Sequence, residues 1–227
     1  MNSTGTLYIV STPIGNLKDI TFRAVEILKS VDLIAAEDTR HTKILTAHYD
    51  IRTPLTSYFE HNKITKGAYL IGLLKEGKTI ALVSDAGTPG ISDPGSHIIR
   101  LAIENDIRTE QIPGPTAVIT GLVLSGMPTD KFIFEGFLPA KPGARKNRLK
   151  VFLDEKRTVI FYESPHRLLK TLNDIYEVFG DIKIACLREL TKKFEEVRRQ
   201  RVSELIEHFT NTKPLGEFVI CLNTNLY

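Results

Sequence analysis

Apolar runs of β-rich composition alternate with stretches of helical spacing through the first half of the chain. The apolar runs cover residues 7–11, 33–37, 79–84 and 109–113. Helical spacing covers residues 20–30, 39–48, 66–77 and 96–105. In the first of these helices, Thr21 is the predicted N-cap, and Ala24, Val25 and Leu28 form the predicted buried face. The alternation predicts βαβ units and therefore a mostly parallel sheet covered by helices.

A second α/β pattern follows Pro113-Gly114-Pro115. These residues interrupt both periodicities, and residues 116–126 after them predict a bridging helix. Further strands are expected at residues 132–136, 158–163, 182–187 and 217–222, with helices at 145–154, 168–179 and 203–209. We therefore expect an α/β protein with two lobes. The N-terminal domain, residues 1–114, has a mostly parallel sheet, and the C-terminal domain, residues 115–227, has a mixed sheet.

The composition is typical of a folded, soluble protein. Apolar residues make up 42% and charged residues 25% of the 227 residues, which are ordinary globular values. No apolar run is long enough to span a membrane and no signal-peptide pattern occurs, so we expect a cytoplasmic location. Cys186 and Cys221 lie in apolar runs without metal-binding spacing, and both are expected to be buried, reduced thiols.

The net charge of +3 is unevenly distributed between the halves. Residues 1–114 carry 12 Lys and Arg against 13 Asp and Glu, whereas residues 115–227 carry 18 against 14. This mild basic excess in the second half is compatible with a polyanionic partner but does not require one.

Three loops rich in glycine and proline each follow a predicted strand of the first lobe. They cover residues 11–16, 85–95 and 113–117. The carboxyl ends of parallel strands meet at one edge of a sheet, where open α/β sheets bind ligands. Any one of these loops could be a simple turn. Three together, with three glycines and two prolines in the middle one, favour backbone that approaches a flat, polar ligand.

The motifs of other ligand-binding classes are absent from the sequence. There is no GxxxxGK[ST] loop for a triphosphate and no GxGxxG after the first strand for a dinucleotide. HExxH, paired CxxC and EF-hand patterns are also missing, so we expect no metal.

Six motifs occur in order along the chain: STPIGNLKDIT, AAEDTRHT, SDAGTPGISDPG, IPGPTAVITGLVLSGMP, FEGFLP and FYESPHRLLKTL. Together they resemble the ribosomal RNA small-subunit methyltransferase I family. That family belongs to the tetrapyrrole methylase superfamily, the class III methyltransferases that use S-adenosylmethionine. The resemblance spans roughly residues 6–222. Residues 11–16 replace the Gly-x-Gly-Pro-Gly-Asp opening usual in the superfamily, which argues against its tetrapyrrole branch.

The resemblance implies a homodimer of two-domain chains that binds S-adenosylmethionine in a cleft between the lobes. It also implies 2′-O-methylation of a cytidine ribose in small-subunit (16S) ribosomal RNA. The residues that it assigns to the methyl donor lie in the three loops and at the end of the next strand, and most would act through backbone groups. They are Pro13, Gly15, Asp85, Ala86, Gly87, Thr88, Pro89, Thr116, Ala117, Glu135, Gly136 and Phe137.

Methylation of a ribose hydroxyl needs in-line geometry and is helped by a base that accepts the hydroxyl proton. The candidates in loops or at strand ends are Glu37, Asp38, Glu60, His61 and Glu163. Asp38 could equally cap a helix, with Arg40 paired to a neighbour, and His61 could be a solvated turn residue. The sequence leaves the choice of base open.

Two basic clusters are candidates for contact with the RNA backbone. The first comprises Lys141, Arg145, Lys146, Arg148 and Lys150, and the second comprises Arg188, Lys192, Lys193, Arg198, Arg199 and Arg201. Phe137 and Phe194 lie near these clusters in sequence and could stack on bases. The second cluster could instead be a solvated helix face, because glutamates interleave it.

Arg167, in the motif SPHR, could lie at the mouth of the cleft, although a helix-initiating turn is an equally natural interpretation. Two other functions also stay open. The chain could methylate a small tetrapyrrole-like acceptor, which the basic residues 141–150 disfavour, or it could bind the donor without catalysis.

Overall fold

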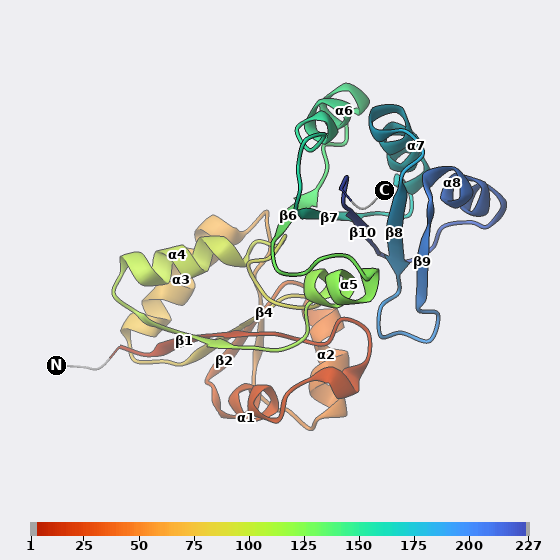
Figure 1. Ribbon diagram of the computed structural model, residues 1–227. Coiled ribbons are helices and arrows are strands. Elements are labelled where there is room, and N and C mark those ends of the chain that lie inside the picture. Colours follow the sequence, from red (N-terminus) through yellow and green to blue (C-terminus); the bar gives the residue numbers. More distant parts are fainter. Residues whose placement is uncertain (1–3, 226–227) are drawn as a thin grey trace. The chain divides into compact units, whose positions relative to one another are not determined.

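The computed structural model describes residues 4–225, and the chain divides after Thr116 into two compact units. The division falls two residues beyond the boundary expected at Gly114. Helix α5 (Ala117–Ser125), which we expected to bridge the lobes, begins the second unit and packs on the second sheet (Figure 1). No helix within residues 4–225 has the length and apolar character needed to cross a membrane.

The first unit contains a fully parallel sheet with the strand order β3-β2-β4-β1-β5. Its strands are β1 (Thr6–Val10), β2 (Leu33–Ala36), β3 (Leu55–Ser57), β4 (Ile80–Val83) and β5 (Arg108–Ile112). Strand β4 is buried at every position, as expected at the centre of a parallel sheet. Strand β3 was not predicted, because its three residues contain only one strongly apolar side chain.

Helices cover both faces of this sheet (Figure 1). They are α1 (Phe22–Ser30), α2 (Thr39–His48), α3 (Lys63–Lys75) and α4 (Gly95–Glu104), with a short 3₁₀ turn η1 (Leu17–Asp19) before α1. Helices α1 and α2 share one apolar cluster, and α3 and α4 share the cluster on the opposite face. The Thr21 hydroxyl accepts a hydrogen bond from the Ala24 amide, which confirms the predicted cap. Ala24 and Leu28 are buried as predicted, whereas Val25 is half-buried.

The second unit contains a mixed sheet with the strand order β6-β7-β10-β8-β9. Its strands are β6 (Phe132–Phe137), β7 (Thr158–Glu163), β8 (Lys183–Arg188), β9 (Glu196–Arg201) and β10 (Phe218–Leu222). Strands β6 and β7 are parallel, and the other pairs are antiparallel. Helices α6 (Pro142–Lys150), α7 (Leu168–Phe179) and α8 (Val202–Asn211) cover one face, and α5 covers the other (Figure 1).

The two cysteines and strand β9 of this unit test two sequence-based expectations. Cys186 and Cys221 are buried free thiols, as predicted, and burial raises the pKa of the Cys221 thiol to about 12. Strand β9 was not predicted, since the alternative considered for its charged residues was a solvated helix face. That alternative is wrong, because β9 pairs with β8 along its whole length.

Candidate functional site

The connections of the first sheet change direction between two neighbouring strands. After β1 the chain continues into α1 on one face, and after β4 it continues into α4 on the opposite face. Because β1 and β4 are adjacent, the loops that follow them diverge to opposite faces at one point of the carboxyl edge. Crevices at such points are the usual ligand sites of open parallel sheets.

The three glycine-rich loops converge at this point, as the sequence predicted. Thr12 and Gly87 exchange two backbone hydrogen bonds of 2.9 and 3.0 Å, which join the first loop to the middle one. The hydroxyls of Ser11 and Thr88 are 2.9 Å apart. In the third loop, a Cβ on Gly114 would lie 3.0 Å from the Ser11 Cβ.

Gly87 lies where all three loops meet. Its φ of +79° belongs to the region that side chains disfavour. A Cβ built on it would lie 3.5 Å from Ile14 of the first loop and 3.8 Å from the Pro115 carbonyl oxygen of the third. Glycine at this position therefore satisfies a conformational requirement and keeps the junction open.

A carboxylate fixes the shape of the middle loop. Asp93 Oδ1 accepts hydrogen bonds from the amides of Gly90 and Gly95, at 2.6 and 2.8 Å. The loop folds back so tightly that a Cβ on Gly95 would lie 2.7 Å from the Gly90 nitrogen. Burial raises the pKa of Asp93, against the opposing effect of these two hydrogen bonds. Sequence reasoning treated Asp93 only as part of a loop, although its position before the helix start in DPG was an available signal.

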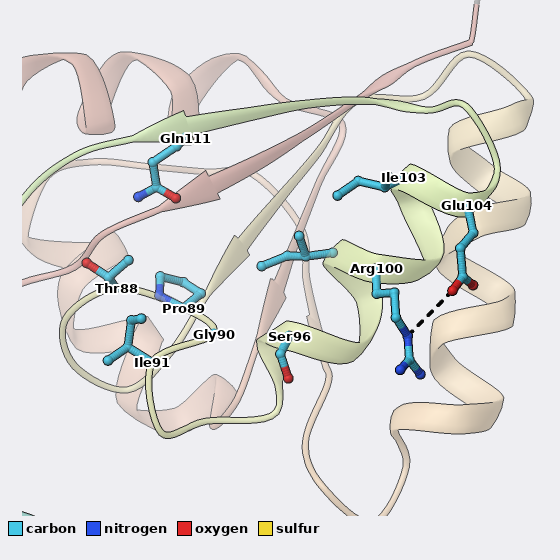
Figure 2. Close-up of a pocket in the computed structure, with 10 residues that line it drawn as sticks. Thr88, Pro89, Gly90, Ile91, Ser96, Arg100, Ile103, Glu104 and Gln111 are labelled. Carbon is cyan, nitrogen blue, oxygen red and sulfur yellow. Dashed lines mark ion pairs between the residues drawn. The ribbon is translucent and has the colours of Figure 1, made fainter. Parts of the chain in front are cut away.

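A groove of about 440 Å³ opens beside the middle loop, between that loop, α4 and β5 (Figure 2). Its lining is apolar along Pro89, Ile91, Ile99 and Ile103. Figure 2 shows Thr88 and Gln111 on the side of the groove away from the Arg100–Glu104 ion pair of 3.6 Å.

Gln111 connects the groove to the converging loops. Its side-chain amide donates to the Ser11 hydroxyl at 3.3 Å. Sequence reasoning missed this residue because it is the next-to-last residue of a strand, and no motif marks it.

Hydrogen bonds join acidic residues that follow the neighbouring strands β2 and β4 at the same edge. The Asp38 amide donates to Asp85 Oδ1 at 3.0 Å, and the Asp85 amide donates to Glu37 Oε2 at 3.3 Å. Glu37 is half-buried, and that burial raises its pKa, with a further contribution from the charges of Asp85 and Asp93. Glu37 therefore has the environment of a proton acceptor.

Asp38 has a different environment from Glu37. Its side chain accepts from the Arg40 amide at the start of α2, and it also binds the Arg40 guanidinium. These contacts with Arg40 lower the pKa of Asp38 to about 2. The structure thus agrees with the helix-cap alternative for Asp38.

The remaining candidate bases are distributed over the two units. Glu60 and His61 follow β3, the outer strand of the first sheet, and Glu60 forms an ion pair with Lys63. Glu163 lies in the second unit, where it accepts from the Thr171 hydroxyl at 2.6 Å and from the Ser164 amide at 2.8 Å. Its complete burial contradicts the expectation of a base open to an RNA hydroxyl.

The second-unit residues that the resemblance assigns to the donor lie at the irregular end of β6. Its pairing with β7 shifts between Phe134 and Phe137, and Gly136 has a φ of +70°. Glu135 forms an ion pair with Arg148, and Phe137 is exposed. The assignment of these residues to the donor stays a prediction, as does that of Ala117 at the start of α5.

The first basic cluster is only partly available to an external anion. Arg145 is 2% exposed and forms a buried ion pair of 2.6 Å with Asp174. This burial contradicts the expectation that Arg145 contacts RNA, because its guanidinium links α6 to α7 instead. Lys146 binds Glu177 at 2.6 Å on the surface, whereas Lys141 and Lys150 are exposed.

Arg167 is also engaged within the second unit. Its guanidinium donates to the Leu138 carbonyl oxygen at 2.7 Å and lies beside the buried Glu163 carboxylate, 3.0 Å away. Arg167 immediately precedes α7, in agreement with the helix-initiating alternative.

The family model for tetrapyrrole (corrin/porphyrin) methylases matches residues 6–206. A ribosomal RNA small subunit methyltransferase I from Escherichia coli O157:H7 is 53% identical, with 90% of this chain and 72% of the relative aligned. The relative of the same name from Thermotoga maritima is 48% identical, with 96% of this chain and 98% of the relative aligned.

Solved structures share the fold at much lower identity. A diphthine synthase superposes with a TM-score of 0.77 at 16% identity, covering 98% of this chain and 92% of that one. A cobalt precorrin-4 methyltransferase gives a TM-score of 0.73 at 17% identity, covering 95% and 94%.

Proposed function

Because the chain belongs to the ribosomal RNA small subunit methyltransferase I family of the tetrapyrrole methylases, we propose that it methylates the 2′-hydroxyl of a cytidine in small-subunit ribosomal RNA. Its methyl donor is S-adenosylmethionine. The observation that carries this proposal is the convergence of the loops 11–16, 85–95 and 113–117 at the point where the first sheet reverses its connections.

The residues at this point fit the donor. When bound, S-adenosylmethionine supplies an electrophilic methyl group on a cationic sulfonium. Gly87 and Gly114 keep side chains out of the junction, so backbone can approach a flat ligand closely. The carboxylates of Glu37 and Asp85 place negative charge at the same edge, which suits a cationic donor with ribose hydroxyls. Pro13, Gly15, Ala86, Thr88, Pro89 and Thr116 belong to the same three loops and complete the proposed donor site.

Glu37 is the proton acceptor that we favour. A carboxyl group with a raised pKa binds a proton more readily than an ordinary one, which helps it take the proton of the attacking hydroxyl. Asp38 is a weaker proton acceptor, because its contacts with Arg40 lower its pKa, and the Glu60 carboxylate is engaged in an ion pair with Lys63. The imidazole ring of His61 stays an alternative acceptor.

The resemblance also supports a homodimer in the cytoplasm, and we include both in the proposal. Sedimentation of the purified protein tests whether it is a dimer, because a dimer has twice the mass of the 25.5 kDa chain.

Transfer of a labelled methyl group tests the proposed reaction. Purified protein, methyl-labelled S-adenosylmethionine and small ribosomal subunits from a strain lacking the modification are incubated together, and the RNA is digested to nucleosides. We expect label in 2′-O-methylcytidine. Label on a base, or none on RNA, contradicts the proposal.

A further inference from the structure

The hairpin of β8 and β9 has an ordered turn at residues 189–195, which we call the 189–195 turn. Glu189 and Thr191 adopt positive φ angles of 53° and 65°, which are uncommon for residues other than glycine. Two side chains brace this conformation. Lys192 forms an ion pair of 2.8 Å with Glu189, and Glu195 accepts from the Thr191 amide at 2.7 Å.

This turn holds an aromatic ring in solvent. Phe194 is 67% exposed, and the Lys193 ammonium lies 5.5 Å from the centre of its ring. Strained backbone persists where the surrounding structure enforces it, and it is concentrated at functional sites. An exposed ring beside an exposed lysine, on a strained and braced turn, is an arrangement that can receive a ligand.

The surrounding charge indicates the class of ligand. Residues 188–201 contain six basic and three acidic side chains. Each acidic side chain already has a partner in the hairpin: Glu189 binds Lys192, Glu195 binds the Thr191 amide, and Glu196 lies between Arg188 and Arg198. Lys193 is exposed, whereas the guanidinium of Arg199 donates to the Leu124 carbonyl oxygen. A positive surface that includes an exposed aromatic ring suits single-stranded nucleic acid.

The turn lies at the same edge of the second sheet as the other basic segment. Strands β7 and β8 are both antiparallel to β10, and β6 is parallel to β7, so the carboxyl ends of β6, β7 and β8 share one edge. Exposed Phe137 ends β6 at this edge, and exposed Lys141 lies in the loop that follows.

We propose that the 189–195 turn is a contact site for single-stranded RNA, in which a base stacks on Phe194 and Lys193 binds a neighbouring phosphate. This inference rests on the proposed function and names the surface that holds its RNA substrate.

Tryptophan fluorescence provides a direct test, because the sequence contains no tryptophan. Phe194→Trp places a single indole on the turn, and the matched control Phe22→Trp places one on α1, at a position that is 92% exposed. Addition of a short unstructured oligoribonucleotide should quench the first indole by stacking and leave the second unchanged. Equal quenching of both, or none in either, overturns the inference.

Binding measurements separate stacking from a merely structural role. Phe194→Leu, which stays apolar, should weaken binding of the oligoribonucleotide about 5- to 150-fold, and Phe194→Tyr should retain it. Lys193→Ala should reduce the slope of log affinity against log salt by about 1. Retained affinity in Phe194→Leu overturns the inference, and if wild type still methylates ribosomal RNA, the proposed function stands. If wild type methylates no RNA, the proposed function itself fails.

Discussion

At the scale of single residues, the pKa values of the two adjacent carboxyl groups of Glu37 and Asp38 are shifted in opposite directions. Glu37 and Asp38 follow the same strand, yet burial raises the pKa of Glu37 whereas Arg40 lowers that of Asp38 to about 2. Sequence alone left both as candidates. The burial of Glu37 depends on residues distant in the chain, whereas the local pairing of Asp38 with Arg40 was one of two alternatives that the sequence left open.

Glu37→Gln should lower kcat about 10²–10⁴-fold because proton acceptance is lost, and it should raise the KM for S-adenosylmethionine by a smaller factor because one of the two carboxylates beside the cationic donor loses its charge. The base must be ionised, so kcat of the wild type should fall as pH decreases through the raised pKa of Glu37. A kinetic series from neutral to acid pH measures both effects. Glu60→Gln serves as the control and should keep kcat. Equal losses in the two variants contradict this assignment.

Asp93→Ala should raise the KM for S-adenosylmethionine about tenfold or more, because the Gly90 and Gly95 amides lose their shared acceptor and the middle loop loosens. Asp93→Asn retains an acceptor oxygen and should show a smaller effect. Steady-state kinetics of both variants give the comparison. Unchanged KM values in both would show that the loop holds its shape without this carboxylate.

Arg145→Met should lower the free energy of unfolding by up to about 3–5 kcal/mol, because buried Asp174 loses its close partner and keeps only the Lys146 ammonium, 3.9 Å away. Replacing both residues, as Arg145→Met with Asp174→Leu, should recover much of this loss. Urea denaturation of the single and double variants measures the difference. Stability unaffected by Arg145→Met would return this arginine to the candidates for RNA contact.

At the scale of elements, long periodic segments were predictable and short or charged ones were not. Helices α2 and α7 and strand β7 have the predicted limits. Strand β9 was not predicted because most of its residues are charged. It forms a strand because it pairs with β8. Tertiary hydrogen bonding of this kind leaves no periodic signal in the sequence.

Helix α5 packs on the second sheet through a glycine. A Cβ on Gly121 would lie 2.6 Å from Val219 Cγ1, so Gly121→Ala should cost about 1–3 kcal/mol of unfolding free energy through overpacking. Gly72→Ala in α3 is the matched control, since its Cβ meets nothing within 4 Å, and it should stabilise the protein by about 0.5–1 kcal/mol. Thermal denaturation shows whether each variant is less or more stable than wild type. Equal effects would contradict the close packing of α5.

At the scale of the whole molecule, the two-lobed α/β architecture and the convergence of three loops followed from the sequence. Parallel strands bring their following loops to one edge whatever the side chains, so the meeting of the loops 11–16 and 85–95 could be predicted, and the structure adds the contact of Ser11 with Thr88. The hydrogen bonds of Asp93 and Gln111 at this site could not be predicted from the sequence, because they depend on how the loops fold back. The same limit applies to Arg145, whose basic character predicted exposure although Asp174 holds it in the interior.

The central claim is that the converging loops bind S-adenosylmethionine, and calorimetric titration of two matched glycine variants tests it most directly. Gly87 and Gly180 have φ angles of +79° and +75°, in the region that side chains disfavour, so alanine is strained at either position. Only Gly87 lies at the loop junction, whereas Gly180 ends α7 in the second unit. Gly87→Ala should weaken donor binding at least about tenfold, and Gly180→Ala should leave it unchanged. Equal affinity in the two variants, or no association with the wild type, would contradict the account.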